Sequence, residues 1–151
     1  MTRFVLAFLV LVPLVCPAAA LAADADYAVD SKDAIVTVGE RGKARVTISA
    51  RGGWHLKAEA PLTLNLSPAK GLAVDKRMLE RADLALRNDT SAIWVVGVVA
   101  SGPGKKAIAA EAGFEICLKD VCRPIKEKIK LAVVAAARGK HATGKKPGVA
   151  R

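Results

Sequence analysis

The residues of this sequence best suited to chemistry are Cys117 and Cys122, which are separated by Leu118-Lys119-Asp120-Val121. Apolar, strand-forming residues precede the first cysteine and follow the second. This pattern predicts one cysteine at the end of a strand, the other at the start of the next, and a four-residue hairpin loop between them. Cysteines that flank such a loop have Cα atoms about 5 Å apart, which a disulfide accepts. The spacing therefore permits a disulfide.

That disulfide could be a structural cross-link or a site of thiol–disulfide exchange, and the residues alone leave both readings open. A cross-link works mainly by restricting the unfolded chain, which for a loop of about six residues contributes only about 2 kcal/mol. A hairpin at a domain edge instead holds both sulfurs where a partner thiolate can reach them. Nearby bases favour thiolate over thiol, and Asp120 and Glu127 offset part of that effect; the bases are Lys119, Arg123, Lys126 and Lys128.

Other chemistry is less well supported by the residue pattern. Two sulfurs lack the further ligands of a zinc site, and the sequence places neither His55 nor His141 beside them, so we expect no metal. His55 follows Trp54, and a histidine in that setting is more typical of a packed structural residue; Trp54 and Trp94 are predicted core aromatics. There is no Ser-His-Asp arrangement, phosphate-binding loop or paired-carboxylate motif in the sequence, and we expect no cofactor.

The elements that must position the cysteines are short strands punctuated by turns. Residues 44–50 and 62–66 alternate apolar and polar side chains, the period of a half-buried strand. Residues 92–100 form the longest apolar run, which predicts a strand buried on both faces. Further strands are expected at 34–38, 72–75, 83–87, 108–118 and 125–134, and a helical turn at 76–82. About eight strands without a helical period predict an all-β fold, an immunoglobulin-like antiparallel β-sandwich over residues 24–137.

The first 23 residues have the pattern of a cleaved secretory signal peptide. A basic start precedes an apolar run at 4–15, and Ala20-Leu21-Ala22 has the small-x-small form of a cleavage site. The run is shorter than the about 20 residues of a membrane span. Lipidation at Cys16 is a weaker alternative, because Val15 before it is not small. Cleavage removes Cys16, and we expect a periplasmic or secreted protein with one cysteine pair, in a compartment where disulfides persist.

The formal charge of +10 is concentrated at the C-terminus, because residues 138–151 carry five basic residues and no acid. This segment also has glycines and a proline and almost no large apolar side chains, so we predict a disordered basic tail. A solvated tail without function is one reading. The other is weak, screened attraction to anionic surfaces such as lipid headgroups, without specific nucleic-acid binding.

Two segments together resemble a known family. Gly113-Phe114-Glu115-Ile116-Cys117, the four-residue gap, Cys122-Arg123-Pro124 and the basic strand 125–134 resemble the N-terminal periplasmic domain of the thiol:disulfide interchange protein DsbD. Gly53-Trp54-His55-Leu56, followed by Pro61-Leu62-Thr63-Leu64, is similar to that family's Gly-aromatic-His strand and the proline after it. The resemblance covers roughly residues 34–134.

The resemblance implies an immunoglobulin-like sandwich whose hairpin disulfide relays reducing equivalents between thioredoxin-fold periplasmic proteins, as a component of a protein-disulfide reductase. It assigns the mixed disulfide to Cys122 and the resolving role to Cys117. Full-length members continue into a membrane-spanning conduit and a thioredoxin-like domain that this sequence does not contain, so we expect a separate electron donor. The family's aromatic cap loop has no assigned counterpart here. The rival hypothesis is a periplasmic binding or assembly domain whose disulfide is only structural.

Overall fold

The computed structural model of the protein describes residues 25–139, which form eleven strands and one 3-10 helix. The predicted signal peptide and nearly all of the predicted basic tail lie outside this range. No helix among the described residues has the length and apolar character needed to cross a membrane. The elements are β1 (Tyr27–Lys32), β2 (Ala34–Thr37), β3 (Arg41–Ala50), β4 (His55–Leu56), β5 (Thr63–Pro68), β6 (Leu72–Val74), β7 (Met78–Leu79), η1 (Arg81–Asp83), β8 (Leu84–Arg87), β9 (Ser91–Ala100), β10 (Gly104–Leu118) and β11 (Val121–Ala136).

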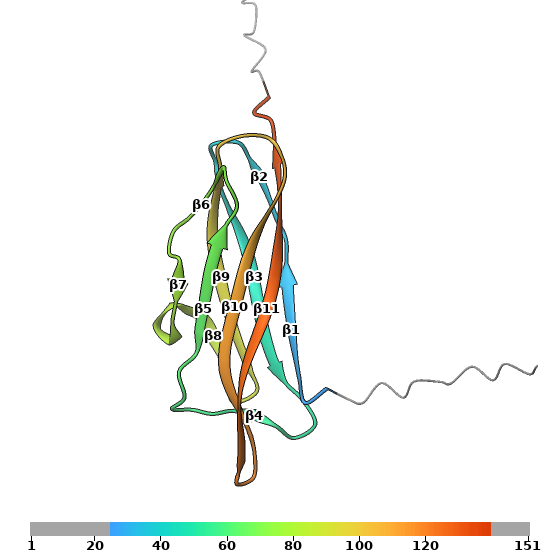
Figure 1. Cartoon of the computed structure of the whole chain (residues 1–151), viewed down its shortest axis with the longest axis vertical. Coiled ribbons are helices and arrows are strands. Elements are labelled where there is room, and N and C mark those ends of the chain that lie inside the picture. Colours follow the sequence, from blue (N-terminus) through green and yellow to red (C-terminus); the bar gives the residue numbers. More distant parts are fainter. Residues whose placement is uncertain (1–24, 140–151) are drawn as a thin grey trace, which may run out of the picture.

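The strands form two sheets that pack face to face (Figure 1). One sheet has the order β1-β3-β9-β6, with β8 also paired to β9. The other has the order β2-β11-β10-β5-β7, with β4 also paired to β10. All pairings are antiparallel except that of β2 with β11, which is parallel. The fold is an immunoglobulin-like β-sandwich, as the sequence predicted.

The core lies between the sheets and is built by alternation along the strands. In β5, Leu64 and Leu66 are buried and Asn65 between them is exposed, as the predicted period of two requires. In β9, Trp94 and every second residue are buried, while the residues between them are only half-buried. The prediction that 92–100 is buried on both faces is therefore wrong, because β9 belongs to a two-layer sandwich in which one face of each sheet meets solvent.

Three local predictions differ from the structure. The segment 76–82 forms the short strand β7 and the start of the 3-10 helix rather than a helical turn on its own. Strand β1 precedes the first predicted strand and pairs with β3 along its whole length. Strands β10 and β11 extend well beyond the predicted 108–118 and 125–134, because the two remain paired almost from end to end.

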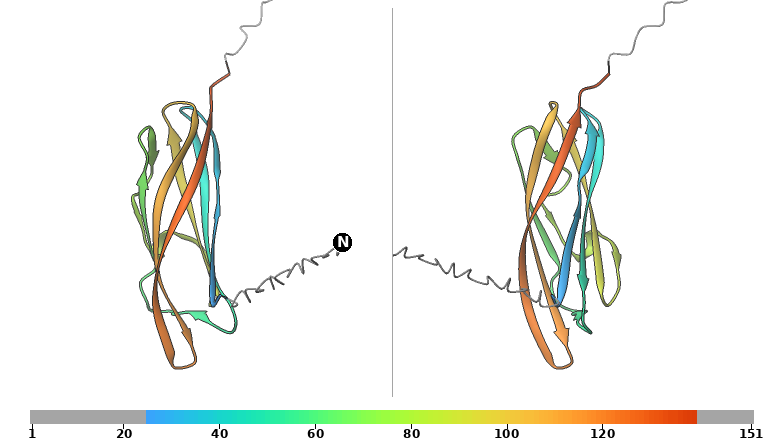
Figure 2. Two further views of the ribbon diagram at one scale, coloured as in Figure 1. Left: turned by 45° about the vertical axis from the view of Figure 1, so that its right-hand side comes forward. Right: turned by 90° about the vertical axis from the view of Figure 1, so that its right-hand side faces the viewer.

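The β10–β11 hairpin is the longest element, and its tip projects past the rest of the sandwich (Figures 1 and 2). A side chain of β1, that of Tyr27, contacts both strands of the hairpin near this tip. Tyr27 stands edge-on to Phe114, with ring centroids 5.3 Å apart, and its hydroxyl donates to Glu127 at 3.0 Å. Burial and the Glu127 carboxylate raise the pKa of Tyr27, because both disfavour the phenolate. The phenol therefore remains a hydrogen-bond donor across the neutral pH range.

Candidate functional site

Cys117 and Cys122 lie directly opposite each other near the tip of the hairpin and are joined by a disulfide. Their Cα atoms are 4.0 Å apart, close to the spacing of a non-hydrogen-bonded antiparallel pair. The predicted four-residue loop is wrong, because Leu118 still pairs with Val121 and only Lys119 and Asp120 form the turn. Lys119 has a φ of 52°, a left-handed conformation of the kind that tight two-residue hairpin turns require. Both cysteines are thus inside the ladder.

Cys117 belongs to the outer face of its sheet, although it is buried. Along β10, Phe114 and Ile116 point into the core, and strand alternation therefore places Glu115 and Cys117 on the opposite side. Cys117 is only 3% exposed, yet it is not part of the hydrophobic cluster between the sheets. Its cover must come from neighbours on the outer face, and Cys122 is one of them.

The two sulfur-bearing residues differ sharply in access. Cys122 is exposed on β11, which pairs at this position with β10 alone, while Cys117 has a strand on each side. On the side away from Cys122, the register partner of Cys117 is His55 of β4. Side chains directly opposite in a sheet share a face, so His55, Cys117 and Cys122 form one row across the outer face. This arrangement leaves one sulfur for an approaching thiolate and shields the other.

His55 was not placed beside the cysteines by the sequence, and the structure corrects this by putting it in register with Cys117. It is exposed rather than packed in the core. Trp94 is fully buried, as predicted, whereas Trp54 is half-buried at the margin of the core. His141 lies outside the described residues.

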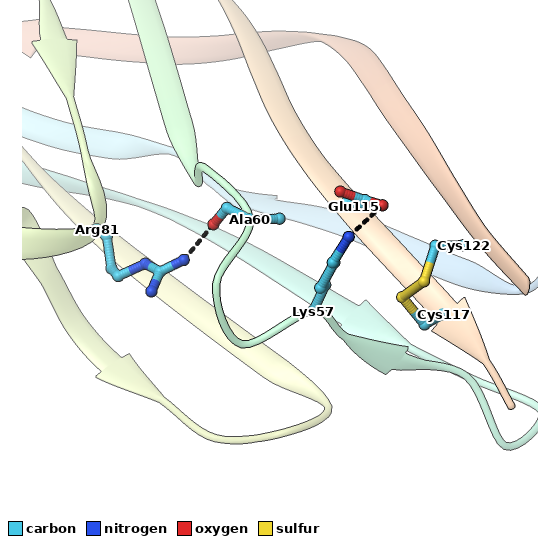
Figure 3. Close-up of polar contacts among 6 residues, drawn as sticks. All are labelled: Lys57, Ala60, Arg81, Glu115, Cys117 and Cys122. Carbon is cyan, nitrogen blue, oxygen red and sulfur yellow. Dashed lines mark hydrogen bonds and ion pairs between the residues drawn. A yellow bond between two sulfur atoms is a disulfide. The ribbon is translucent and has the colours of Figure 1, made fainter. Parts of the chain in front are cut away.

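The sequence did not predict the ion pair that Lys57 and Glu115 form beside the disulfide. The Lys57 ammonium lies 3.1 Å from Glu115 Oε1, and the Lys57 backbone N–H donates to the Glu115 carbonyl at 3.0 Å (Figure 3). A Glu115 carboxylate oxygen and the Sγ atoms of both cysteines lie within 4.8 Å of one another. Glu115 could have been found from its place two residues before Cys117, which puts it on the same strand face. Lys57 could not, because it is distant in sequence.

Two arginines hold the loop that contains Lys57 by hydrogen bonds to its backbone. Arg81 donates to the Ala60 carbonyl (Figure 3), and Arg87 donates to the Ala58 carbonyl at 2.7 Å. These bonds satisfy backbone acceptors of the loop that follows β4. The position of the lysine beside Glu115 therefore depends on the body of the sandwich as well as on β4.

Not all of the predicted charged neighbours act on the sulfurs. Arg123 turns to the other side of the strand, where its guanidinium stacks on Trp54 at 4.3 Å from the ring centroid and pairs with Asp26. Glu127 is engaged by Tyr27. Lys126 lies on the same face as Cys122, since the two are an even number of residues apart. The charged group whose closeness to both sulfurs is shown is the Glu115 carboxylate, which Lys57 pairs.

Metal binding has one feature in its favour and two against it. Glu115 and the two sulfurs could supply three ligand atoms. In the disulfide, however, the sulfurs are bonded to each other and offer no thiolate to an ion. The Glu115 carboxylate is also already paired with Lys57. We therefore assign no metal to this site.

The Glu115→Gln substitution is expected to make the reduced protein more reactive toward iodoacetamide at neutral pH. A carboxylate this close to the sulfurs repels a thiolate, and its removal leaves the Lys57 charge to favour one; about 1 kcal/mol of such repulsion corresponds to roughly fivefold in rate. Lys57→Met should change the rate in the opposite direction. Glu111→Gln is the matched control, because Glu111 lies on the same strand face but about 20 Å along β10 from Cys117. Equal rates in all three variants would show that the ion pair does not act on the sulfurs.

No protein-family model matches the sequence, and no curated protein matches it. Solved structures with a similar fold include WR4, a C. elegans MSP family member, at 9% identity and a TM-score of 0.42 over 74% of this chain and 98% of that one. A PapD-like domain of human CEP192 has 11% identity and a TM-score of 0.37 over 73% and 84% of the two chains. A cohesin module from a Clostridium perfringens family 33 glycoside hydrolase has 9% identity and a TM-score of 0.41 over 74% and 97%. These likenesses concern architecture alone: the chain is an immunoglobulin-like β-sandwich that carries a disulfide.

Proposed function

We propose that this protein is a periplasmic or secreted thiol–disulfide exchange module of the DsbD N-terminal type, which relays reducing equivalents between thioredoxin-fold partners through Cys117 and Cys122. The observation that carries the proposal is the unequal exposure of the two sulfur-bearing residues, one buried at 3% and one exposed, at the tip of a projecting hairpin. A disulfide that acts only as a cross-link has no need of such asymmetry, whereas exchange requires one sulfur to be reached first.

In the reductive half of the relay, a thiolate of the donor attacks Cys122 Sγ. The bond between the two Sγ atoms breaks, Cys117 leaves as a thiolate and takes up a proton, and a mixed disulfide joins Cys122 to the donor. The second thiolate of the donor then attacks the donor's first sulfur in the mixed disulfide, and Cys122 is released as a thiolate. Two electrons enter the pair, and the donor leaves as a disulfide.

In the oxidative half, the roles of attacker and target are exchanged. The Cys122 thiolate attacks a disulfide of the acceptor, and one acceptor sulfur leaves as a thiolate. Cys117 then loses its proton and attacks Cys122 Sγ in the mixed disulfide as a thiolate. The bond between the two cysteines is restored, and the acceptor sulfur leaves as a thiolate that takes up a proton, which frees the reduced acceptor. Because Cys117 lies directly opposite Cys122 in the ladder, the resolving sulfur is held ready for this step.

The surroundings of Cys122 suit contact with a folded partner. Pro124, two residues further along the strand and on the same face, is exposed, and Val121 beside the turn is 61% exposed on the opposite face of the hairpin. Exposed apolar side chains around a reactive sulfur offer area that a partner can bury during the short life of a mixed disulfide. The projection of the hairpin keeps this surface clear of the body of the sandwich (Figure 2).

The reduction potential of the pair tests this proposal directly. We expect a value above about −300 mV, in the range of disulfides that exchange with thioredoxin-fold proteins. The measurement is an equilibrium titration against dithiothreitol redox buffers, read by mass after alkylation of free thiols. A potential far below about −300 mV would instead favour the rival function, a binding or assembly domain with a structural disulfide.

A further inference from the structure

The outer face of the sheet has a groove that begins beside the disulfide and runs along β10. It lies between β5 and β11, and its floor is formed by the outer-face residues of β10, among which the small Ala109 and Gly113 flank Glu111. A hollow of about 220 Å³ borders Thr63, Gly113 and Pro124, and a second of about 440 Å³ borders Asn65 and Ala109. Because these residues are neighbours in the β5–β10 register, the two hollows follow one another along the strand. We call them together the outer-face groove.

Each of the two hollows lies beside a residue of β10 that has little or no side chain. At Gly113 a Cβ atom would lie 2.8 Å from Thr63 Oγ1, too close for a side chain without displacement of the threonine. Beyond it, Ala109 presents only a methyl group. At these two positions the floor is backbone and a short side chain, with Glu111 between them opposite Lys128, and an extended peptide segment can approach the sheet closely at each position.

One wall of the groove is a row of lysines on β11. Lys126, Lys128 and Lys130 are exposed and share the strand face of Cys122, since each is an even number of residues from it. None of the ion pairs found between residues 25 and 139 includes any of the three. The first two also border the hollows directly.

The acidic residues of this face are fewer than its lysines. Glu111 lies directly opposite Lys128 in the β10–β11 register, and Glu115 is paired with Lys57. With Lys126 and Lys130 added, four lysines face two glutamates, so the groove keeps an excess of positive charge. A groove lined by an excess of positive charge on low-dielectric protein concentrates anionic groups and raises their rate of association.

A protein partner bound at Cys122 would also cover the three lysines. At about 3.3 Å per residue, Lys126 is about 13 Å and Lys130 about 26 Å along β11 from Cys122. An interface of ordinary size, about 800 Å² on each side, covers that distance. We propose, building on the exchange function above, that the outer-face groove binds an extended acidic segment adjacent to the reactive cysteine of the thiol-bearing partner. This contact orients the partner thiol toward Cys122.

Two synthetic thiol peptides test the proposal. Each has one cysteine followed by about eight residues, long enough to reach Lys130; one alternates glutamate and serine, the other glutamine and serine. The measured quantity is the second-order rate constant for opening the oxidised Cys117–Cys122 bond. In the Lys126→Gln/Lys128→Gln/Lys130→Gln variant, the acidic peptide should react about tenfold more slowly than with the wild type at low ionic strength, and the neutral peptide should react at the wild-type rate. Salt at about 1 M should abolish the difference.

The matched control removes the same charge from the other sheet. Lys32, Lys43 and Arg45 are exposed on β1 and β3, and their replacement by glutamine should leave both peptide rates unchanged apart from a small effect of net charge. Equal slowing of the acidic peptide in the two triple variants would overturn the groove and leave the exchange function intact.

A cysteine-free copy of the acidic peptide separates binding from exchange. With serine in place of its cysteine, the fluorescently labelled peptide should bind the oxidised wild type, by anisotropy, more tightly than it binds the groove variant. Binding that is the same for both proteins contradicts the groove. Binding as expected, but without opening of the disulfide by either thiol peptide, contradicts the exchange function alone.

Discussion

The Cys117→Ala variant is expected to form a stable mixed disulfide through Cys122, and the Cys122→Ala variant is expected to form little or none through Cys117. The reason is access: Cys122 is exposed, while Cys117 is 3% exposed on a central strand. Attack on or by a thiol needs in-line approach of the second sulfur, so we expect a difference of at least about tenfold in the rate of adduct formation. The partner is a thioredoxin that lacks its resolving cysteine and whose remaining cysteine is joined in a mixed disulfide to 5-thio-2-nitrobenzoate. The thiolate of the variant attacks the thioredoxin sulfur, 5-thio-2-nitrobenzoate leaves as a thiolate, and protein adducts are measured by mass.

Denaturant supplies the control for this experiment. In concentrated urea the two single-cysteine variants should react with iodoacetamide at nearly the same rate, because the fold no longer shields Cys117. A native-state difference that persists in urea would have its origin in local sequence rather than in burial. If Cys117 forms the adduct in the native state as quickly as Cys122, the assigned roles are wrong.

The sandwich was predictable from the sequence because alternation along β3 and β5 is a local property. Val46 and Ile48, like Leu64 and Leu66, point inward as their spacing indicates. The parallel pairing of β2 with β11 was not predictable, since it joins residues about a hundred positions apart and no local pattern encodes it. The both-face burial expected for β9 failed for a related reason: an apolar run shows that burial is tolerated, not that a second layer is present.

The candidate site was predictable in part. The cysteine spacing gave the disulfide, which the structure contains. The burial of Cys117 could not be predicted from the sequence, because Cys117 is in register with His55 of a strand that is distant in sequence. Lys57 reaches Glu115 by the same pairing. From the sequence, the different roles of the two sulfurs followed from the family resemblance alone; the unequal exposure of the two cysteines supports them, and they stay a prediction that the adduct experiment decides.

A relay site must exist in both redox states, so reduction of the disulfide is expected to leave the sandwich folded. The loop closed by the bond is short, and its loss should lower the free energy of unfolding by only about 2 kcal/mol. The core supports this expectation, since the buried cluster between the sheets does not include Cys117. Trp94→Ala sets the scale: Trp94 is fully buried and its indole N–H donates to the Glu80 carbonyl at 3.1 Å, so its removal should cost about 3–5 kcal/mol.

The comparison is made by urea unfolding, followed by circular dichroism, of the oxidised protein, the reduced protein and the oxidised Trp94→Ala variant. The reduced protein should have a midpoint between those of the other two, and its slope with denaturant should stay close to that of the oxidised form, since the native state is equally compact. A reduced protein less stable than Trp94→Ala, or unfolded without denaturant, would make the disulfide a structural requirement. A bond that the fold cannot lose cannot alternate between donor and acceptor, and the relay would then be excluded on stability alone.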